Sequence, residues 1–271
     1  MSDYRRTNLE NVRIYGPSPY NIAVIHGGPG AAGEMAPVAR ELAAKWGVLE
    51  PLQTAASLEG QVEELRAVLE KEGDIPVTLI GFSWGAWLGF IVTAKYPTLV
   101  KKLILIGCGA FGDEYAAQTQ QTRQSRLTET ERNELKSLVI ALNDPTVKDK
   151  DISFARLGAL ASKADTYAPL QSASDEPDEI IINSDIFKRI WQDADELRRS
   201  GKLLELGYHI KCPVVAIHGD YDPHPAEGVQ KPLSVILSDF RIILLKNCGH
   251  KPWVERDAKD GFYEVLKGEL L

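Results

Sequence analysis

A Gly-Phe-Ser-Trp-Gly segment at residues 81–85 is the part of the chain whose residue types point most directly to chemistry. An apolar run at residues 77–80 precedes it, and a helix-like stretch at 86–96 follows it. A G-x-S-x-G pattern between a strand and a helix predicts a sharp turn that holds the hydroxyl of Ser83 out at the sheet edge. The helix N-terminus beside it favours developing negative charge. Small residues cluster in many loops, so the strand–turn–helix context is what predicts a nucleophile here.

A nucleophilic serine needs a base, and the base needs a carboxylate to orient it. On this kind of turn the order along the chain is serine, then Asp or Glu, then histidine. Of the five histidines, His250 comes last, in a loop after the strand-like run 241–245, where a base belongs. Two aspartates, Asp220 and Asp222, follow the preceding strand-like run 213–217. We favour Asp222, because Asp220 stands close enough to the strand end to form the turn; the alternative for either is a turn aspartate beside Gly and Pro.

A glycine-rich loop, His-Gly-Gly-Pro-Gly at residues 26–30, follows another apolar strand-like run at 21–25. Acyl transfer needs N–H donors aimed at the oxyanion of the tetrahedral intermediate. We expect one donor from the backbone of Trp84, which follows the nucleophile, and one from this loop, where Gly28 fits. Glycine-rich turns also bind phosphate, but no Lys-Ser or Lys-Thr follows this one, which disfavours a P-loop. His26 is expected to pack and hydrogen-bond within its own loop, with ligand binding as the alternative.

In this order, the HGGPG loop, the G-x-S-x-G turn, the G-x-x-D of residues 219–222 and the final Gly-His resemble the α/β-hydrolase superfamily. HGGPG together with a Ser-Trp-Gly turn is most similar to the proline iminopeptidase-like branch. The resemblance covers about residues 12–110 and 203–271. The site residues that it implies are the nucleophile Ser83, the acid Asp222, the base His250 and the oxyanion amides of Gly28 and Trp84.

The chain departs from that peptidase branch at two places. The usual Asp-Gln-Arg-Gly segment is replaced by Leu-Glu-Pro-Leu-Gln-Thr at residues 49–54, and Phe82 stands where the branch usually has glycine. Both departures weaken the likeness to a peptidase and leave Ser83, Asp222 and His250 intact. We therefore expect a serine hydrolase that cleaves a small carboxylic ester through an acyl-enzyme. A proline iminopeptidase-like N-terminal aminopeptidase is the alternative, and a catalytically silent binding module on the same fold is a remote one.

The two activities need different residues in the region that covers the serine. An aminopeptidase must pair the substrate ammonium with a carboxylate. An esterase should present apolar side chains, such as Phe187 and Trp191. The acidic candidates in this region are Glu114, Glu129, Glu131, Asp175, Glu176 and Glu179.

Strand-like and helix-like segments alternate at both ends of the chain, which predicts an α/β fold with a doubly wound, mostly parallel sheet. About six or seven strands are visible, so an N-terminal edge strand is expected to be missing. Charged, helical segments replace the alternation in the middle, where we expect a helical lid. The predicted units are an α/β-hydrolase core of residues 1–110 and 207–271 and a lid of residues 111–206.

Composition excludes several other classes. A formal charge of −7 without a long basic run disfavours nucleic-acid binding. Three cysteines without C-x-x-C spacing support neither disulfides nor a zinc site, as is typical of a reducing cytosol. The 18-residue charge-free run 77–94 has about the length of a membrane span, but glycines and a serine interrupt it, so we expect a buried strand and helix. No signal peptide is evident. The expectation is a cytoplasmic protein that acts on a small ester or short peptide, without cofactor, metal or membrane partner.

Overall fold

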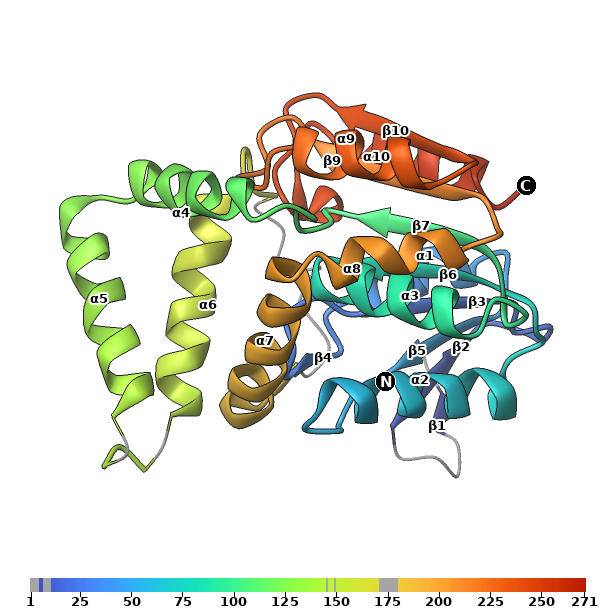
Figure 1. Ribbon diagram of the computed structural model, residues 1–271, viewed down its shortest axis with the longest axis horizontal. Helices are drawn as coiled ribbons and strands as arrows, with labels where there is room; N and C mark the ends of the chain where they lie inside the picture. The colour runs from blue at the N-terminus through green and yellow to red at the C-terminus, as the bar shows by residue number, and fades with distance from the viewer. Residues whose placement is uncertain (1–4, 7–10, 145, 149, 171–179) are drawn as a thin grey trace.

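The computed structural model describes residues 5–6, 11–144, 146–148, 150–170 and 180–271. Their centre is an eight-stranded sheet in the order β1-β2-β5-β3-β6-β7-β9-β10 (Figure 1). Strand β2 pairs antiparallel with β1 and β5, and the other neighbours pair in parallel, which confirms the predicted fold class. The strands are β1 (Arg5–Arg6), β2 (Val12–Tyr15), β3 (Ile22–Ile25), β5 (Val48–Pro51), β6 (Val77–Phe82), β7 (Val100–Ile106), β9 (Val214–Gly219) and β10 (Phe240–Leu245).

The expectation that an N-terminal edge strand is missing was wrong. Strand β1 pairs antiparallel with β2, with Arg5 opposite Ile14 and Arg6 opposite Arg13. A two-residue strand made of two arginines has no apolar alternation, and alternation is the signal by which a strand is found in a sequence.

Helices cover both faces of the sheet. Successive residues of a strand point to opposite faces. In β3, Ala23 and Ile25 join the core on one face, and Ile22 and Val24 join the core on the other. Strands buried on both faces become continuous apolar runs, as these are. The helices of the first face are α2 (Leu58–Glu72), α3 (Trp84–Lys95) and α9 (Glu227–Ile236), and those of the second are α1 (Ala36–Ala43) and α10 (Lys259–Gly268).

The chain between β7 and β9 forms a helical insertion that stands out beyond the sheet (Figure 1). Helix α5 begins with the capping box of Thr128 and Glu131 that the sequence predicts. The insertion ends in two short elements that return to the core, where the first packs against α9 and the second against α3. Its elements are α4 (Glu114–Arg126), α5 (Glu129–Asn143), α6 (Asp151–Asp165), β8 (Ile181–Ile182), α7 (Ser184–Arg199), α8 (Lys202–Glu205) and η2 (Leu206–His209).

The apolar run 77–94 folds as expected into a strand and a helix, β6 and α3. Every residue of this run is buried except Ser83, which is partly exposed. Among the described residues, no helix is both long enough and apolar enough to cross a membrane. The run therefore encloses one accessible hydroxyl in an otherwise buried segment.

Candidate active site

The turn between β6 and α3 holds Ser83 in a strained backbone conformation. Its φ of 50° and ψ of −112° lie in a region that residues other than glycine rarely adopt. The Ser83 N–H donates to the carbonyl of Ile106 (2.9 Å), which fixes the turn against β7. The flanking glycines are required: a Cβ on Gly81 would lie 2.2 Å from the carbonyl oxygen of Gly85, and one on Gly85 would lie 2.5 Å from that of His26.

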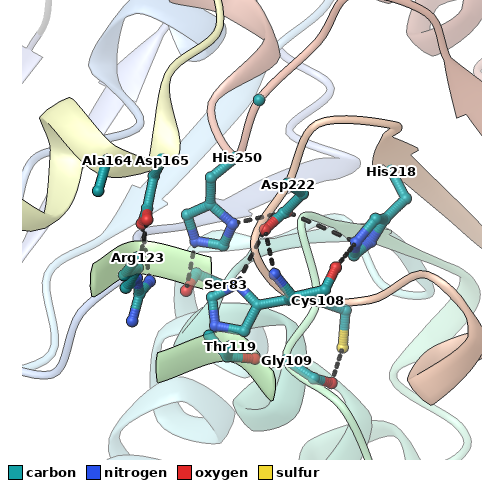
Figure 2. Close-up of polar contacts among 12 residues, drawn as sticks. Ser83, Cys108, Gly109, Thr119, Arg123, Ala164, Asp165, His218, Asp222 and His250 are labelled. Atoms are coloured by element: carbon teal, nitrogen blue, oxygen red, sulfur yellow. Dashed lines mark hydrogen bonds and ion pairs between the residues drawn. The ribbon is translucent and has the colours of Figure 1, made fainter. Parts of the chain in front are cut away.

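Three side chains form one hydrogen-bonded chain beyond the carboxyl ends of the strands (Figure 2). Ser83 Oγ lies 3.0 Å from His250 Nε2. His250 Nδ1 lies 2.7 Å from Asp222 Oδ2. These residues follow β6, β10 and β9, so the parallel sheet brings together side chains that are far apart in the sequence. A histidine at these distances is placed to take a proton from the serine.

Of the two competing aspartates, Asp222 is the one that faces the histidine. Asp222 is 8% exposed. Asp220 is exposed, and its Oδ1 accepts the backbone N–H of Cys248 (3.2 Å). Asp220 therefore braces the loop before His250, as expected of a residue that forms a turn.

Three of the five histidines surround the Asp222 carboxylate. Besides His250, the ring of His224 contacts Oδ1 through Nδ1 (2.9 Å), and His218 Nε2 lies 3.6 Å from Oδ2. Burial raises the pKa of Asp222, but the three histidines outweigh burial and hold that pKa well below its usual value. Asp222 therefore stays ionised. Sequence reasoning missed His218 and His224, although their spacing of four and two residues from Asp222 was a visible signal.

The pocket around the His250 ring is shaped by Gly107 and Phe82. Gly107 has φ 51°, and a Cβ there would lie 2.7 Å from the His250 carbonyl oxygen and 3.1 Å from Nδ1. The ring of Phe82 packs against the imidazole, with centroids 4.9 Å apart, and against Trp253 at 4.7 Å. Phe82, where the chain departs from the peptidase branch, thus forms a wall of the histidine pocket.

A fully buried carboxylate, Glu255, joins the His250 loop to the helical insertion. Its Oε1 accepts the backbone N–H groups of Gly249 and Tyr167, both at 2.8 Å. Its Oε2 accepts the N–H of Ala168 (2.7 Å). One side chain therefore fixes two segments that meet beside the base, and sequence reasoning missed it.

Asp165, the last residue of α6, contacts the backbone of His250. Its carbonyl accepts the N–H of His250 (2.9 Å). Its carboxylate accepts two hydrogen bonds from Arg123 on α4, each 2.7 Å (Figure 2). Burial lowers the pKa of Arg123, but the bonds to Asp165 outweigh it and raise that pKa, so the guanidinium stays protonated. The positive charge of Arg123 thereby balances the negative charge of the Asp165 carboxylate beside the site.

Three of the acidic candidates named from the sequence lie on described residues, and each is exposed or already engaged. Glu114 and Glu129 are exposed. Glu131 pairs with Lys163 and caps α5, and these bonds lower its pKa to about 2. The remaining candidates, Asp175, Glu176 and Glu179, lie outside the described residues.

The glycine-rich loop, residues 26–30, packs tightly against the turn that holds Ser83. Gly28 has φ 28°, and a Cβ on Gly27 would lie 2.6 Å from the ring of Phe82. His26 is buried as expected, with Nδ1 2.7 Å from the Gly27 carbonyl and Nε2 accepting the N–H of Gln53 (3.3 Å). Burial lowers the pKa of His26, so its ring is neutral. The ring therefore stabilises the glycine-rich loop through these hydrogen bonds.

Trp84 opens helix α3, so its backbone N–H is one of the first four that lack an acceptor within the helix. Its indole N–H donates to Gln61 on α2 (3.1 Å). The backbone, and not the indole, is therefore the part of Trp84 that is suited to an oxyanion role.

The helical insertion also contacts the glycine-rich loop. Strand β4 (Ala31–Ala32) pairs antiparallel with β8, and the N–H of Asn183 donates to the carbonyl of Gly30 (2.9 Å). A Cβ on Gly30 would lie 2.2 Å from the Asn183 carbonyl oxygen. The insertion therefore contacts both the loop that carries His250 and the glycine-rich loop that carries Gly28.

A cavity of about 1030 Å³ lies between α7 and the hairpin of α5 and α6. Ser83 and His250 are not among its lining residues, so it is separate from them. The larger apolar side chains that line it are Val139, Leu142, Phe154, Leu157, Phe187 and Trp191.

A column of aromatic rings connects this cavity to the serine helix. Trp191 stacks between Phe187 (6.0 Å, 6°) and Trp87 (6.1 Å, 12°). Phe187 in turn contacts Phe154, with ring centroids 4.5 Å apart. Trp87 lies one helical turn after Ser83. Phe187 and Trp191, the two residues expected to present an apolar surface, thus lie between the cavity and the serine helix α3.

One group of described residues has the composition of a metal site. Ligand atoms of Asp222, His224 and His250 lie within 4.8 Å of one another. Both imidazoles contact the carboxylate at 2.7 and 2.9 Å, whereas ligands of a tetrahedral zinc stand roughly 3.4 Å apart. The spacing fits hydrogen bonds better than metal coordination. The three cysteines, Cys108, Cys212 and Cys248, are free thiols.

The protein family described as "alpha/beta hydrolase fold" matches residues 50–252, which is most of the chain. The chain therefore belongs to the α/β-hydrolase family, as the sequence motifs indicated.

The relatives include lipases and peptidases. Human monoacylglycerol lipase ABHD6 is 23% identical over 205 residues, which cover 75% of this chain and 58% of the lipase, so the chain spans little more than half of that relative. The crystal structure of VinJ matches with a TM-score of 0.65 and 19% identity, covering 96% of this chain and 93% of VinJ. A proline iminopeptidase from Mycobacterium smegmatis matches with a TM-score of 0.60 and 19% identity, with the same coverage. At these identities the solved structures show the shared fold, and family membership supports a hydrolase.

Proposed function

We propose that the protein is a serine hydrolase that cleaves a small carboxylic ester through an acyl-enzyme. The observation that carries this proposal is the hydrogen-bonded chain from Ser83 Oγ through His250 to Asp222, with the serine on a strained turn. Strain of this kind costs about 1–3 kcal/mol and is concentrated at functional sites. A binding module without catalysis has no need of it.

In the proposed reaction His250 Nε2 takes the proton of Ser83 as Oγ attacks the ester carbonyl. The oxyanion of the tetrahedral intermediate accepts the N–H groups of Gly28 and Trp84. His250 then protonates the leaving alkoxide as the C–O bond breaks, which leaves the acyl group on Ser83. Water, deprotonated by His250, attacks the acyl-enzyme and releases the acid. Asp222 remains ionised throughout and stabilises the imidazolium.

In this proposal residues 111–206 act as the lid, and residues 1–110 with 207–271 act as the catalytic core. The contacts of Asp165 with His250 and of Asn183 with Gly30 support this division, because they place the insertion against both halves of the site. A cover of this kind excludes water and shapes specificity.

Two observations favour an ester over a peptide with a free N-terminus. Asp165 is the one buried carboxylate of the insertion among the described residues. It already pairs with Arg123, so it is not available to bind an ammonium group. The stacked rings of Phe187, Trp191 and Trp87 give the insertion an apolar surface next to the serine helix α3, of the kind expected for a neutral acyl substrate. The similarity to human monoacylglycerol lipase agrees with an ester. The similarity to a proline iminopeptidase keeps the aminopeptidase as the second candidate.

The test is a matched set of chromogenic substrates. We expect p-nitrophenyl acetate and butyrate to be hydrolysed at a higher kcat/KM than prolyl p-nitroanilide. N-acetylation of the prolyl substrate should have little effect, because no ammonium group is recognised. A free prolyl anilide that reacts faster than the esters, and at least tenfold faster than its N-acetyl form, would show an aminopeptidase, since a charge-assisted hydrogen bond contributes about 1.5–3 kcal/mol.

A further inference from the structure

The short segment Asp-Pro-His-Pro at residues 222–225 carries a second imidazole against the triad carboxylate. His224 Nδ1 lies 2.9 Å from Asp222 Oδ1, and the backbone N–H of His224 donates to the same oxygen, also at 2.9 Å. The other oxygen, Oδ2, is left to face His250 at 2.7 Å. The two oxygens of Asp222 are thus divided between His224 and His250.

The position of His224 is itself fixed from the sheet. His218, a fully buried residue of β9, places its Nε2 2.8 Å from the carbonyl oxygen of His224. Two prolines, Pro223 and Pro225, flank His224 and restrict the backbone on either side. The side chain of His224 is 14% exposed, and its ring lies beside that of His250, with centroids 4.7 Å apart.

We propose that His224 is a positioning residue for the triad: its two N–H groups hold Oδ1 of Asp222, aim Oδ2 at His250, and share the carboxylate charge. This inference rests on the proposed serine hydrolase activity. It gives a role to a histidine that the Ser–His–Asp chemistry does not itself use.

The role requires a neutral ring with its proton on Nδ1. Burial lowers the pKa of His224 to about 4, even though Asp222 opposes that shift. Above about pH 5 the ring is therefore neutral, and the contact with a carboxylate places the proton on Nδ1. Without this donor, the negative charge of Asp222 concentrates on Oδ2 and stabilises the imidazolium form of the base, so the acid limb of the pH–rate profile is expected to move upward.

Other ionisable groups surround this cluster, and they are the same in the wild type and in every variant of the test. They are His218 on β9, Cys108 after β7, Arg123 on α4, Asp165 on α6, and Asp220, Cys248, Lys251 and Glu255 around the His250 loop.

The test compares His224→Leu with His224→Asn, since an asparagine amide can donate to Oδ1 from the place of Nδ1 and does not titrate. The matched control is His209→Leu, at an exposed histidine of η2. With p-nitrophenyl acetate, we expect His224→Leu to lose at least tenfold in kcat and to move the acid limb of the pH–rate profile upward by about half a pH unit. His224→Asn should stay within about threefold of the wild type at an unchanged midpoint, as should His209→Leu.

A His224→Leu protein with wild-type melting temperature, kcat and acid midpoint overturns the inference, as does a His224→Asn protein that is as impaired as the leucine variant. A measurement on the wild type decides the matter if His224→Leu does not fold. In ¹⁵N spectra of histidine-labelled protein, assigned by the signal absent from His224→Asn, we expect a neutral Nδ1–H ring from pH 5.5 to 9. A titration midpoint near 6.5, or an Nε2–H ring, overturns it. A wild type that lacks esterase activity refutes the proposed function, whereas an active wild type with an indifferent His224 refutes only this inference.

Discussion

The polar groups near Ser83, His250 and Asp222 differ in burial from those of the outer hairpin. This hairpin is formed by α5 and α6. Asp222 and Glu255 are buried, and each accepts several hydrogen bonds from the segments around it. Helix α5 has no buried residue along its described length, and Ile140 on α5 and Ile152 on α6 are 69% and 73% exposed. Ion pairs on this hairpin, such as Arg156 with Glu134, lie at the surface.

This difference shows where precision is built into the molecule. A buried carboxylate with full hydrogen bonding fixes geometry, because leaving any of its partners unpaired is costly. Exposed ion pairs contribute about 0–1 kcal/mol and constrain little. We infer that the contacts at Asp165, where α6 ends, and at Asn183 hold the loops of His250 and Gly28, and that the exposed surface of α5 and of the start of α6 does not position them.

The largest effect is expected where the two aspartates differ. Asp222→Asn should lower kcat by roughly 10⁴-fold without unfolding the protein, because an amide offers His250 the wrong hydrogen-bond partner. Asp220→Asn is the matched control and should cost less than tenfold, since Asp220 contacts a backbone N–H outside the triad. Steady-state kinetics of both proteins, at equal melting temperature, checks this. The reverse ranking would show that Asp220 is the acid.

Removing the buried carboxylate beside the base should come next. Glu255→Gln replaces one acceptor oxygen by an NH₂ group that faces backbone N–H donors, so we expect the free energy of unfolding to fall by about 2–4 kcal/mol. The comparison variant is Glu264→Gln, at an exposed residue of α10, with an expected change below about 0.5 kcal/mol. Urea denaturation measures both. Equal stability of the two variants contradicts the role given to Glu255.

Part of the pH dependence of stability should arise at His224, next to Asp222. The pKa of His224 is lowered from 6.5 to about 4 in the folded protein, so between these values the unfolded chain binds a proton that the folded protein does not. Stability therefore rises with pH across this window and falls on acidification, by up to about 1.4 kcal/mol per pH unit for one proton. Urea titrations at pH 7 and pH 5 should show a smaller difference for His224→Asn than for the wild type. An equal difference removes His224 as the source.

The smallest effect is expected on the outer hairpin. Ile152→Ser should change the free energy of unfolding by less than about 0.5 kcal/mol, because the side chain is 73% exposed. The buried Ile190 of α7 is the contrasting position, and Ile190→Ala should cost about 2–5 kcal/mol. Similar losses for the two variants would mean that the hairpin is packed as tightly as the core.

The order of the elements and the meeting of Ser83, Asp222 and His250 in space could be predicted because both depend on local signals. The run 77–85 combines a buried strand with a G-x-S-x-G turn, and a parallel sheet brings such turns to one edge. The contacts around the triad escaped prediction because they depend on distant pairs. Glu255 and Tyr167 are 88 residues apart, and neither shows in the sequence that it meets the other. Strand β1 was missed for a different reason, the lack of any apolar alternation in two residues.

Labelling with a fluorophosphonate tests the central claim most directly, because only an activated serine reacts with it. Peptide mass spectrometry should place the adduct on Ser83, and Ser83→Ala should abolish it. Ser137→Ala, which removes an exposed serine of α5, should react as the wild type does. An adduct on another serine, or none on a folded wild type, would contradict the assignment of Ser83, His250 and Asp222 as a catalytic triad.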